Sequence, residues 1–260
     1  MLSEQRYREI ERLLDQEGSI KTSELCRILQ TSRETIRRDL EAMEDKGLLK
    51  RIHGGAMRAV ETDEKSSAYT SFQKRKSEHF SDKEKIARKA AEYIREGQAI
   101  ALDSGTTALE LARVIKTRFR SLTVVTNSLA IANELAGTEG IVLVLTGGVY
   151  RADEEAFVSD IATLIFSRIN VDLFFLTTCG ISVERGITYQ RMDEILVQNK
   201  MMDAAAKTIV ITDSSKIGVN SLVKMCDISR ISMIITDSGV SRQQAEAFEQ
   251  EGIPVAVSET

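Results

Sequence analysis

The feature that most constrains the fold of this 260-residue chain is a series of short apolar runs in its last two thirds, separated by stretches with helical periodicity. Short runs that are apolar throughout are typical of strands buried on both faces, and helices between such strands indicate a mainly parallel sheet covered on both sides. We therefore predict an α/β domain whose strands lie at residues 99–103, 122–127, 141–146, 172–177, 208–213 and 231–237.

The first 58 residues follow a different pattern. Apolar residues at helical spacing predict one helix over residues 3–17 and a second over residues 22–29. The capping-box pattern Thr31-Ser32-Arg33-Glu34 predicts the start of a third helix, which Gly47 ends. A small strand pair, starting at residues 48–51, then follows the third helix. This order of elements predicts a winged helix-turn-helix, which is a DNA-binding fold.

The third helix carries two adjacent arginines outside its apolar stripe of Ile36, Leu40 and Met43. Arginine reaches both base edges and phosphates in a DNA groove. Alternatively, Arg37 and Arg38 are solvated charges paired with Asp39 or Glu41, but the apolar stripe, the preceding short helix and the basic wing together favour DNA contact. His53 either touches the DNA backbone or is a plain turn residue. Eight residues are predicted to contact DNA: Ser32, Arg33, Thr35, Arg37, Arg38, Arg51, His53 and Gly54.

Charge and composition divide the chain. Residues 20–58 carry nine basic and six acidic side chains, whereas residues 80–260 carry 19 basic and 24 acidic ones. A mildly basic end on an acidic body is typical of a DNA reader attached to another domain. Residues 59–82 include a polar stretch without periodicity, which we interpret as a linker. The predicted domains are therefore a DNA-binding domain at residues 1–58 and a sensor domain at residues 83–260.

Several classes of protein are disfavoured. No apolar run is long enough for a membrane span, and the chain begins without an apolar signal region. Cys26, Cys179 and Cys226 are scattered, which argues against disulfides and structural zinc, so we expect a cytoplasmic protein without a metal. Dinucleotide and Walker motifs are absent, and no cofactor is expected. The two histidines, His53 and His79, lie outside the predicted sensor domain, which excludes histidine acid/base catalysis there.

Small polar residues follow successive predicted strands, where loops of an open α/β sheet converge on ligands. Gly105-Thr106-Thr107 opens a helix and offers free N–H groups, hydroxyls and a positive dipole end to a phosphate, with Arg151 and Lys216 as countercharges. Asp103 either accepts hydrogen bonds from sugar hydroxyls or is structural. Taken singly, each such turn is usually only a cap. Together they predict twelve residues of an anion site: Asp103, Ser104, Gly105, Thr106, Thr107, Thr126, Asn127, Ser128, Gly147, Gly148, Arg151 and Lys216.

These motifs resemble the DeoR family of bacterial transcription regulators over essentially the whole chain. The resemblance rests on residues 35–40 and 51–56 in the first domain, and on residues 85–87, 102–107, 123–128, 147–151 and 213–216 in the second. It implies a sensor similar to ribose-phosphate isomerase and CoA-transferase folds, which binds a phosphorylated sugar without converting it. It also implies a homodimer or homotetramer that binds double-stranded operator DNA and, usually, represses a carbohydrate operon until the metabolite relieves repression.

Three positions depart from the pattern of that family. Ser159 stands where glycine is common, residues 177–180 replace a glycine-alanine type segment, and Gln198 stands where a lysine is often found. These departures bear on the identity of the effector. One alternative function is a sugar-phosphate isomerase-like enzyme with a DNA-binding appendage, although no clear catalytic acid/base set is present. Another is a constitutive DNA binder whose sensor responds to nothing.

Overall fold

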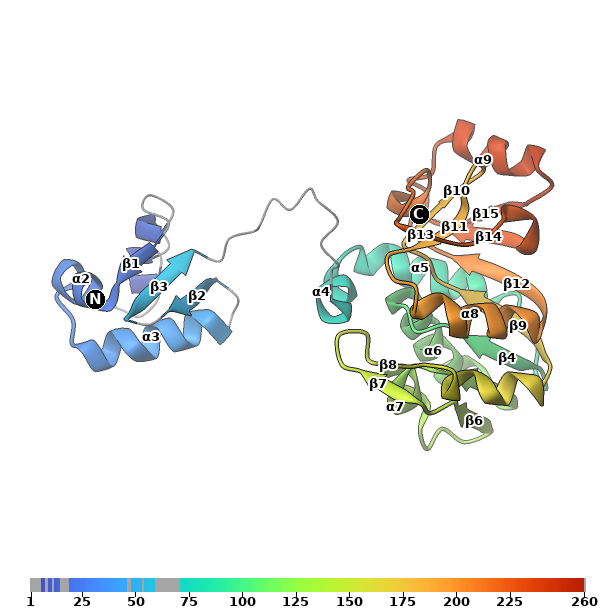
Figure 1. Cartoon of the computed structure of the whole chain (residues 1–260), viewed down its shortest axis with the longest axis horizontal. Helices are drawn as coiled ribbons and strands as arrows, with labels where there is room; N and C mark the ends of the chain where they lie inside the picture. Colours follow the sequence, from blue (N-terminus) through green and yellow to red (C-terminus); the bar gives the residue numbers. More distant parts are fainter. Residues whose placement is uncertain are drawn as a thin grey trace. The chain divides into compact units, whose positions relative to one another are not determined.

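The computed structural model describes residues 6–7, 9–10, 12–14, 19–45, 48–52, 54–58 and 71–259. The chain forms two compact units, Met1–Ala68 and Tyr69–Thr260, and Figure 1 shows the elements of each. Within the described residues, no helix has the length and apolar character needed to cross a membrane.

The smaller unit is a winged helix-turn-helix, as the sequence predicts. It contains α2 (Thr22–Leu29), α3 (Arg33–Asp45) and an antiparallel sheet of β1 (Ser19–Lys21), β3 (Gly55–Arg58) and β2 (Leu49–Ile52), in that spatial order. The described residues between 6 and 14 are helical. The predicted stripe on α3 is buried, with Ile36 and Met43 fully covered and Leu40 2% exposed.

Two local interactions position α3. The Ser32 hydroxyl accepts the Thr35 backbone N–H at 3.2 Å, so the helix is capped one residue later than the predicted capping box, which placed the cap at Thr31. Asp39 is buried and accepts hydrogen bonds from Arg6 at 2.6 and 3.0 Å. Asp39 therefore joins α3 to the start of the unit and does not pair with the neighbouring arginines.

The larger unit is built on a seven-stranded parallel sheet, which confirms the predicted α/β class. The strand order is β15-β14-β12-β9-β4-β5-β6, and every pairing is parallel. All six predicted strands are present, and β15 adds a seventh. The strands are β4 (Ala99–Leu102), β5 (Leu122–Thr126), β6 (Ile141–Leu145), β9 (Val171–Leu176), β12 (Ala205–Ile211), β14 (Met233–Thr236) and β15 (Val255–Val257).

Helices cover both faces of this sheet (Figure 1). One core cluster contains buried residues of α5 (Phe80–Ala91), α6 (Thr106–Arg118) and α7 (Leu129–Leu135). The other contains residues of α8 (Glu194–Asp203), α9 (Arg242–Gln250) and the short helix η1 (Ile161–Ser167). Successive strand residues alternate between the clusters, since Ile100 and Leu102 of β4 face the first and Ala101 faces the second.

Smaller antiparallel elements lie beside the main sheet. A three-stranded sheet joins β10 (Gly180–Ser182), β11 (Gly186–Tyr189) and β13 (Val223–Cys226), and a hairpin joins β7 (Val149–Arg151) to β8 (Ala156–Val158).

The predicted linker at residues 59–82 needs correction at its C-terminal end. Helix α4 (Phe72–Ser77) and the start of α5 fall within that range. Phe72 is 1% exposed and belongs to the same core cluster as Ile86 of α5. One buried aromatic side chain therefore anchors a segment whose other residues are mostly polar, which is why the sequence reads as a linker there. Residues 59–70 lie outside the described part of the chain.

Candidate functional site

The outer side of α3 carries the arginines predicted to contact DNA. The side chains of Arg37 and Arg38 are 51% and 75% exposed. A shallow depression between α3 and the β2–β3 wing is lined by Thr22, Arg33, Arg37, Leu40, Arg51, Gly54 and Gly55. The structure thus brings four of the eight predicted residues together: Arg33, Arg37, Arg51 and Gly54. Ser32, Thr35 and Arg38 lie on α3 or at its start outside this depression, and His53 lies outside the described residues.

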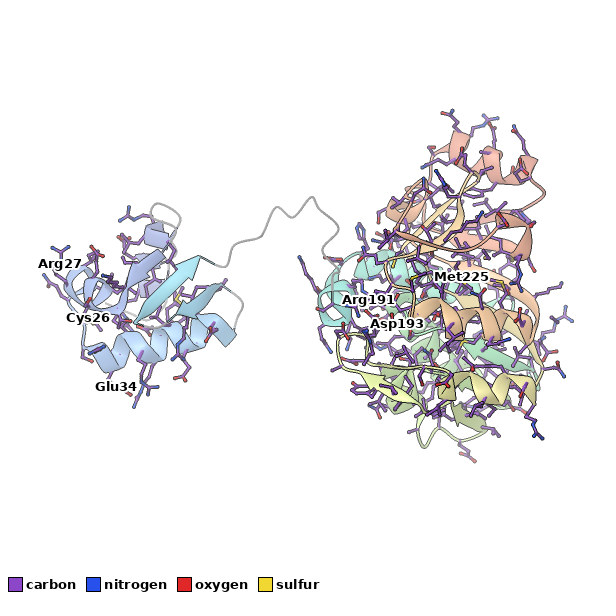
Figure 2. All side chains as sticks on the ribbon, viewed as in Figure 1. Cys26, Arg27, Glu34, Arg191, Asp193 and Met225 are labelled. Atoms are coloured by element: carbon purple, nitrogen blue, oxygen red, sulfur yellow. The ribbon has the colours of Figure 1, made fainter. Side chains whose placement is uncertain are left out.

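Carboxylates on the same face hold these arginines. Arg37 pairs with Glu34 at 2.9 Å and with Glu41 at 3.4 Å, and Arg38 pairs with Glu34 at 3.2 Å. Arg51 of the wing also reaches Glu41 at 3.4 Å. The hydrogen bond from Arg37 lowers the pKa of Glu34 to about 2, so this carboxylate is ionised at neutral pH. Figure 2 shows Glu34 pointing away from the strands of its unit.

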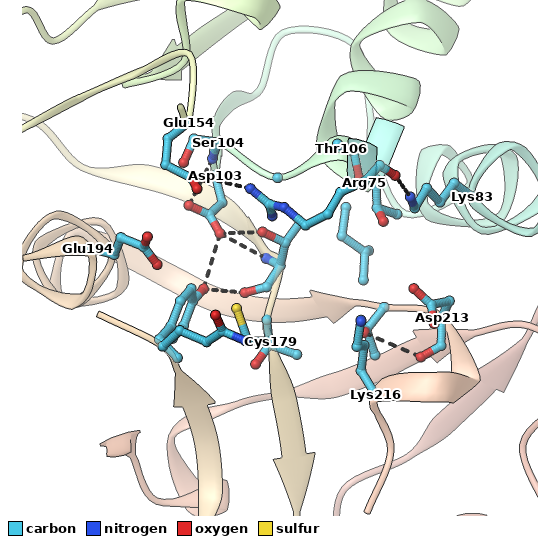
Figure 3. Close-up of a pocket in the computed structure, with 18 of the residues that line it drawn as sticks. Arg75, Lys83, Asp103, Ser104, Thr106, Glu154, Cys179, Glu194, Asp213 and Lys216 are labelled. Carbon is cyan, nitrogen blue, oxygen red and sulfur yellow. Dashed lines mark hydrogen bonds and ion pairs between the residues drawn. The ribbon is translucent and has the colours of Figure 1, made fainter. Parts of the chain in front are cut away.

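The larger unit contains a cavity of about 910 Å³, open mouth included, at the carboxyl ends of β4, β9 and β12 (Figure 3). From β4 the chain proceeds to β5 and β6 on one side, whereas the later strands lie on the other side, so β4 and β9 flank a topological switch point. Ligands bind at such points in open α/β sheets. Six of the twelve predicted residues line the cavity: Asp103, Ser104, Gly105, Thr106, Thr107 and Lys216.

The other six predicted residues do not line this cavity, because they follow β5 and β6, on the far side of β4. Ser128 caps α7 by accepting the Ile131 N–H at 3.3 Å, and Asn127 donates from its side-chain amide to the Phe157 carbonyl at 3.0 Å. Arg151 pairs with Asp193 at 2.7 Å. The three others are Thr126, which is fully buried, and Gly147 and Gly148, which have φ angles of 68° and 117°.

Asp103 anchors the floor of the cavity. It is 1% exposed, and its carboxylate accepts hydrogen bonds from the Ser104 N–H at 2.8 Å, the Thr177 N–H at 3.1 Å and the Thr177 hydroxyl. Tyr189 donates to it at 3.2 Å and Gln198 at 3.1 Å. Burial raises the pKa of Asp103, against the effect of these donors. Of the two roles open from the sequence, the hydrogen bonds favour the structural one, because donors of the chain contact both oxygens.

One end of the cavity is suited to an anion. The N-cap of α6 is Gly105, which supplies no side-chain cap, and Thr106 and Thr107 occupy the first turn. Lys216 makes no ion pair with the described residues. Lys83 is buried and donates to the carbonyls of Arg75 and Glu78, the latter at 2.6 Å. Burial lowers the pKa of Lys83, and the nearby Asp213 carboxylate opposes that shift.

The other end is acidic. Glu154 and Glu194 are 6% and 7% exposed, and Figure 3 shows both on the side away from Lys216. One oxygen of Glu154 accepts a hydrogen bond from Arg75 of α4. Burial raises the pKa of Glu154 to about 8, with a further contribution from the charge of Glu194, and burial raises the pKa of Glu194 to about 7. The cavity therefore has two ends of opposite character.

The sequence analysis missed several charged residues that line the cavity. Arg75 lies within the predicted linker and Lys83 directly follows it, and no local motif marked Glu154 or Glu194. Two of the three departures from the family pattern did mark the cavity in the sequence, since Cys179 and Gln198 both line it. Among the described residues, no group of three or more His, Cys, Asp or Glu side chains is placed to hold a metal ion.

Comparison with protein families matches both units. Residues 6–62 match the DeoR-like helix-turn-helix domain, and residues 78–238 match the DeoR C-terminal sensor domain. The chain is 34% identical to a putative aga operon transcriptional repressor of Escherichia coli O157:H7, covering 97% of this chain and 93% of that protein. It is 33% identical to the HTH-type transcriptional regulator GolR of Listeria innocua, covering 98% of both.

Further relatives and solved structures are more distant. The glycerol-3-phosphate regulon repressor of Escherichia coli K12 is 31% identical, with 92% of both chains covered. Ribose 5-phosphate isomerase from Plasmodium falciparum matches 54% of this chain and 54% of its own, at 18% identity and a TM-score of 0.40. eIF2B delta from Chaetomium thermophilum matches 61% of this chain and 56% of its own, at 16% identity and a TM-score of 0.41.

The full-length relatives are named as regulators or repressors of transcription, not as enzymes, which confirms a regulator over the isomerase alternative. Two family matches cover the winged helix-turn-helix and most of the α/β unit. The chain therefore belongs to the DeoR family of transcriptional regulators.

Proposed function

We propose that this protein is a cytoplasmic, sequence-specific DNA-binding repressor of a carbohydrate operon, and that a phosphorylated sugar modulates its binding to DNA. The observation that carries the proposal is that one chain has both an arginine-bearing helix α3 and a cavity in which Lys216 makes no ion pair with the described residues. Relatives named for the aga operon and the glycerol-3-phosphate regulon support the link to sugar metabolism.

The anion end supports a phosphate as one part of the effector. The first turn of α6 presents backbone N–H groups and the positive end of the helix dipole, and Thr106 and Thr107 add hydroxyls. Lys216 contributes a positive charge from the loop after β12. A phosphate dianion matches this set of donors, whereas a neutral sugar would leave the Lys216 charge without a counterion.

The DNA-binding role favours a homo-oligomer, because two recognition helices must meet two half-sites of the operator. Several exposed apolar side chains of the larger unit lie on elements that contact one another. Helix η1 packs against β8 and α8, and β8 pairs with β7. They include Ile161 and Leu164 of η1, Tyr150 of β7 and Leu196 of α8. We assign contact between copies to this surface.

Effector control then requires a difference in affinity for two states of the oligomer. A preference of about 5.5 kcal/mol for the DNA-incompetent arrangement moves the population from 1:99 to 99:1. Reorientation of the two copies is sufficient, because it changes the spacing of the two α3 helices.

The test is fluorescence anisotropy of the full chain with its own upstream DNA, at fixed salt, against a scrambled duplex. We expect specific binding that a sugar phosphate releases. A ligand that tightens binding would make the protein an activator or a corepressed repressor. Equal affinity for both duplexes and for every ligand would contradict the proposal.

Substitution of the α3 arginines tests the DNA surface in the same assay. Arg37→Ala or Arg38→Ala is expected to weaken operator binding by about 1–3 kcal/mol if that arginine contacts a base. Arg118→Ala, an exposed cation in the other unit, is the matched control and is expected to bind normally. Unchanged operator affinity in both α3 variants would remove the recognition role of this helix.

Substitution of Lys216 tests the anion end. Lys216→Ala is expected to bind DNA normally and to lose release by the sugar phosphate, because the unpaired cation of the cavity is gone. The measurement is the ligand concentration needed for half release. A normal response in this variant would place the phosphate elsewhere.

A further inference from the structure

The acidic end of the cavity contains buried acceptor atoms without hydrogen-bond partners. They are one carboxylate oxygen each of Glu154 and Glu194, and the side-chain carbonyl oxygens of Gln190 and Gln198. All four residues line the cavity, and Glu154, Glu194 and Gln198 are more than nine-tenths buried. Buried polar atoms are normally paired, so a cluster of four unpaired acceptors indicates a missing set of donors.

The charge around these acceptors is partly negative at neutral pH, since burial raises the pKa of Glu194 only to about 7, and a bound cation favours the ionised carboxylates. Glu154, Glu194 and the buried Asp103 meet at this end, and Arg75 reaches one oxygen of Glu154. The nearby cations are engaged with carboxylates of their own, since Arg191 pairs with Asp153 at 2.6 Å and Arg151 with Asp193 at 2.7 Å. The missing partner is therefore a donor that also carries positive charge.

Resting on the function proposed above, we infer that the effector is an amino sugar phosphate, whose ammonium group binds at Glu154 and Glu194 while its phosphate binds at the start of α6 beside Lys216. An ammonium group has three N–H donors and no acceptor, so it complements a cluster made only of acceptors. A hydroxyl supplies a single donor and an acceptor, and it leaves the negative charge uncompensated. The two ends of the cavity thus match the two charges of one small molecule.

The first test compares matched ligands that differ only in the amino group. Glucosamine 6-phosphate is paired with glucose 6-phosphate, and galactosamine 6-phosphate with galactose 6-phosphate, in calorimetric titrations of the full chain. At about pH 7 an amine with a pKa near 8 is mostly protonated. We expect at least one amino sugar phosphate to bind about tenfold to a hundredfold more tightly than its hydroxyl counterpart, as for a hydrogen bond to a charged group.

The second test removes the charge at the acidic end. Glu194→Gln is nearly isosteric and is expected to abolish the preference for the amino ligand while binding of the hydroxyl ligand stays within about twofold. Glu154→Gln is a second variant in case the first does not fold, and folding is checked by operator binding. The matched control is Glu139→Gln, an exposed carboxylate of the same unit outside the cavity, which is expected to keep the preference.

The outcomes separate this inference from the proposed function. Hydroxyl sugar phosphates that bind as tightly as their amino counterparts would overturn the ammonium site and leave the sugar-phosphate effector standing. An amino preference that survives in both glutamine variants would also overturn it. Mg²⁺ binding that is lost in Glu194→Gln would assign the acidic end to a metal ion instead. Failure of every sugar phosphate to bind would contradict the proposed function itself.

Discussion

Ser159 has a backbone conformation that its side chain does not favour. Its φ angle is 100°, in the region that glycine adopts freely, and its buried hydroxyl has no hydrogen-bond partner. The departure from glycine at this position, visible in the sequence, therefore has a local energetic cost. The neighbouring Gly148 has a φ angle of 117°.

Replacing Ser159 is expected to stabilise the larger unit. Ser159→Gly relieves the strained φ angle and removes an unpaired buried hydroxyl, and we expect a gain of about 1 kcal/mol after the entropy of the added glycine is subtracted. The measurement is the unfolding temperature of the larger unit by differential scanning calorimetry. Gly148→Ala is the opposite control and is expected to destabilise, because its Cβ would lie 2.9 Å from the Val158 carbonyl oxygen. A lower unfolding temperature for Ser159→Gly would contradict the assignment of strain.

At the scale of the element, α3 carries carboxylates that would compete with DNA for the arginines proposed to contact it. Glu34 and Glu41 hold Arg37, Arg38 and Arg51 in ion pairs, and a phosphate must displace these carboxylates. The exposed pairs are individually weak, so they orient the arginines more than they stabilise the helix.

Removing one competitor is expected to strengthen binding to DNA of any sequence. Glu34→Gln removes the ion pair of Arg38 and one of the two ion pairs of Arg37, and it removes a charge that repels phosphate. We expect about a threefold to tenfold higher affinity for the scrambled duplex at low salt. Binding is measured by anisotropy across a salt series. Glu24→Gln, on α2, is the control for charge on this unit. An affinity for the scrambled duplex equal to that of the natural chain would show that Glu34 does not compete with phosphate.

The sequence predicts elements better than it predicts the cavity, for a physical reason. The strands and the stripe on α3 follow local periodicity, and Gly105 to Thr107 form a contiguous helix start, so each is visible in a short window. Glu154 and Glu194 come from separate segments and acquire their role only when the β7–β8 hairpin and α8 pack together. Thr126 to Ser128 resemble a ligand loop in sequence, but Ser128 caps α7 and Asn127 donates to the Phe157 carbonyl.

For the whole molecule, the buried carboxylates link stability to pH. Glu154 and Glu194 have folded-state pKa values of about 8 and about 7, above the ordinary value of 4.5. Between about pH 4.5 and pH 8 the two carboxyls of the folded protein therefore hold protons that the same groups in the unfolded chain have released. The contribution of these two groups to the free energy of unfolding is therefore greatest below about pH 4.5. It is lost progressively as the pH rises towards 8.

We expect this pH dependence to be measurable in the unliganded protein. Thermal unfolding of the larger unit is expected to lose about 1–3 kcal/mol of stability between about pH 5 and 8, from these groups alone. The charges of Arg75 and Arg191 oppose these pKa shifts and reduce the loss, whereas those of Asp103 and Asp193 add to it. The variant Glu194→Gln isolates the contribution and is expected to show a shallower slope. An identical slope in the variant would show that Glu194 is ionised in the folded state.

If the effector binds as we propose, the two ends of the cavity also determine which metabolites the protein rejects. A sugar bisphosphate that placed one phosphate at α6 would bring its second phosphate towards Glu154 and Glu194, where like charges repel. Discrimination of this kind works by rejecting competitors as much as by attracting the effector. Transcription under this regulator would then be insulated from swings in the pool of doubly phosphorylated sugars, even where these greatly outnumber its own signal.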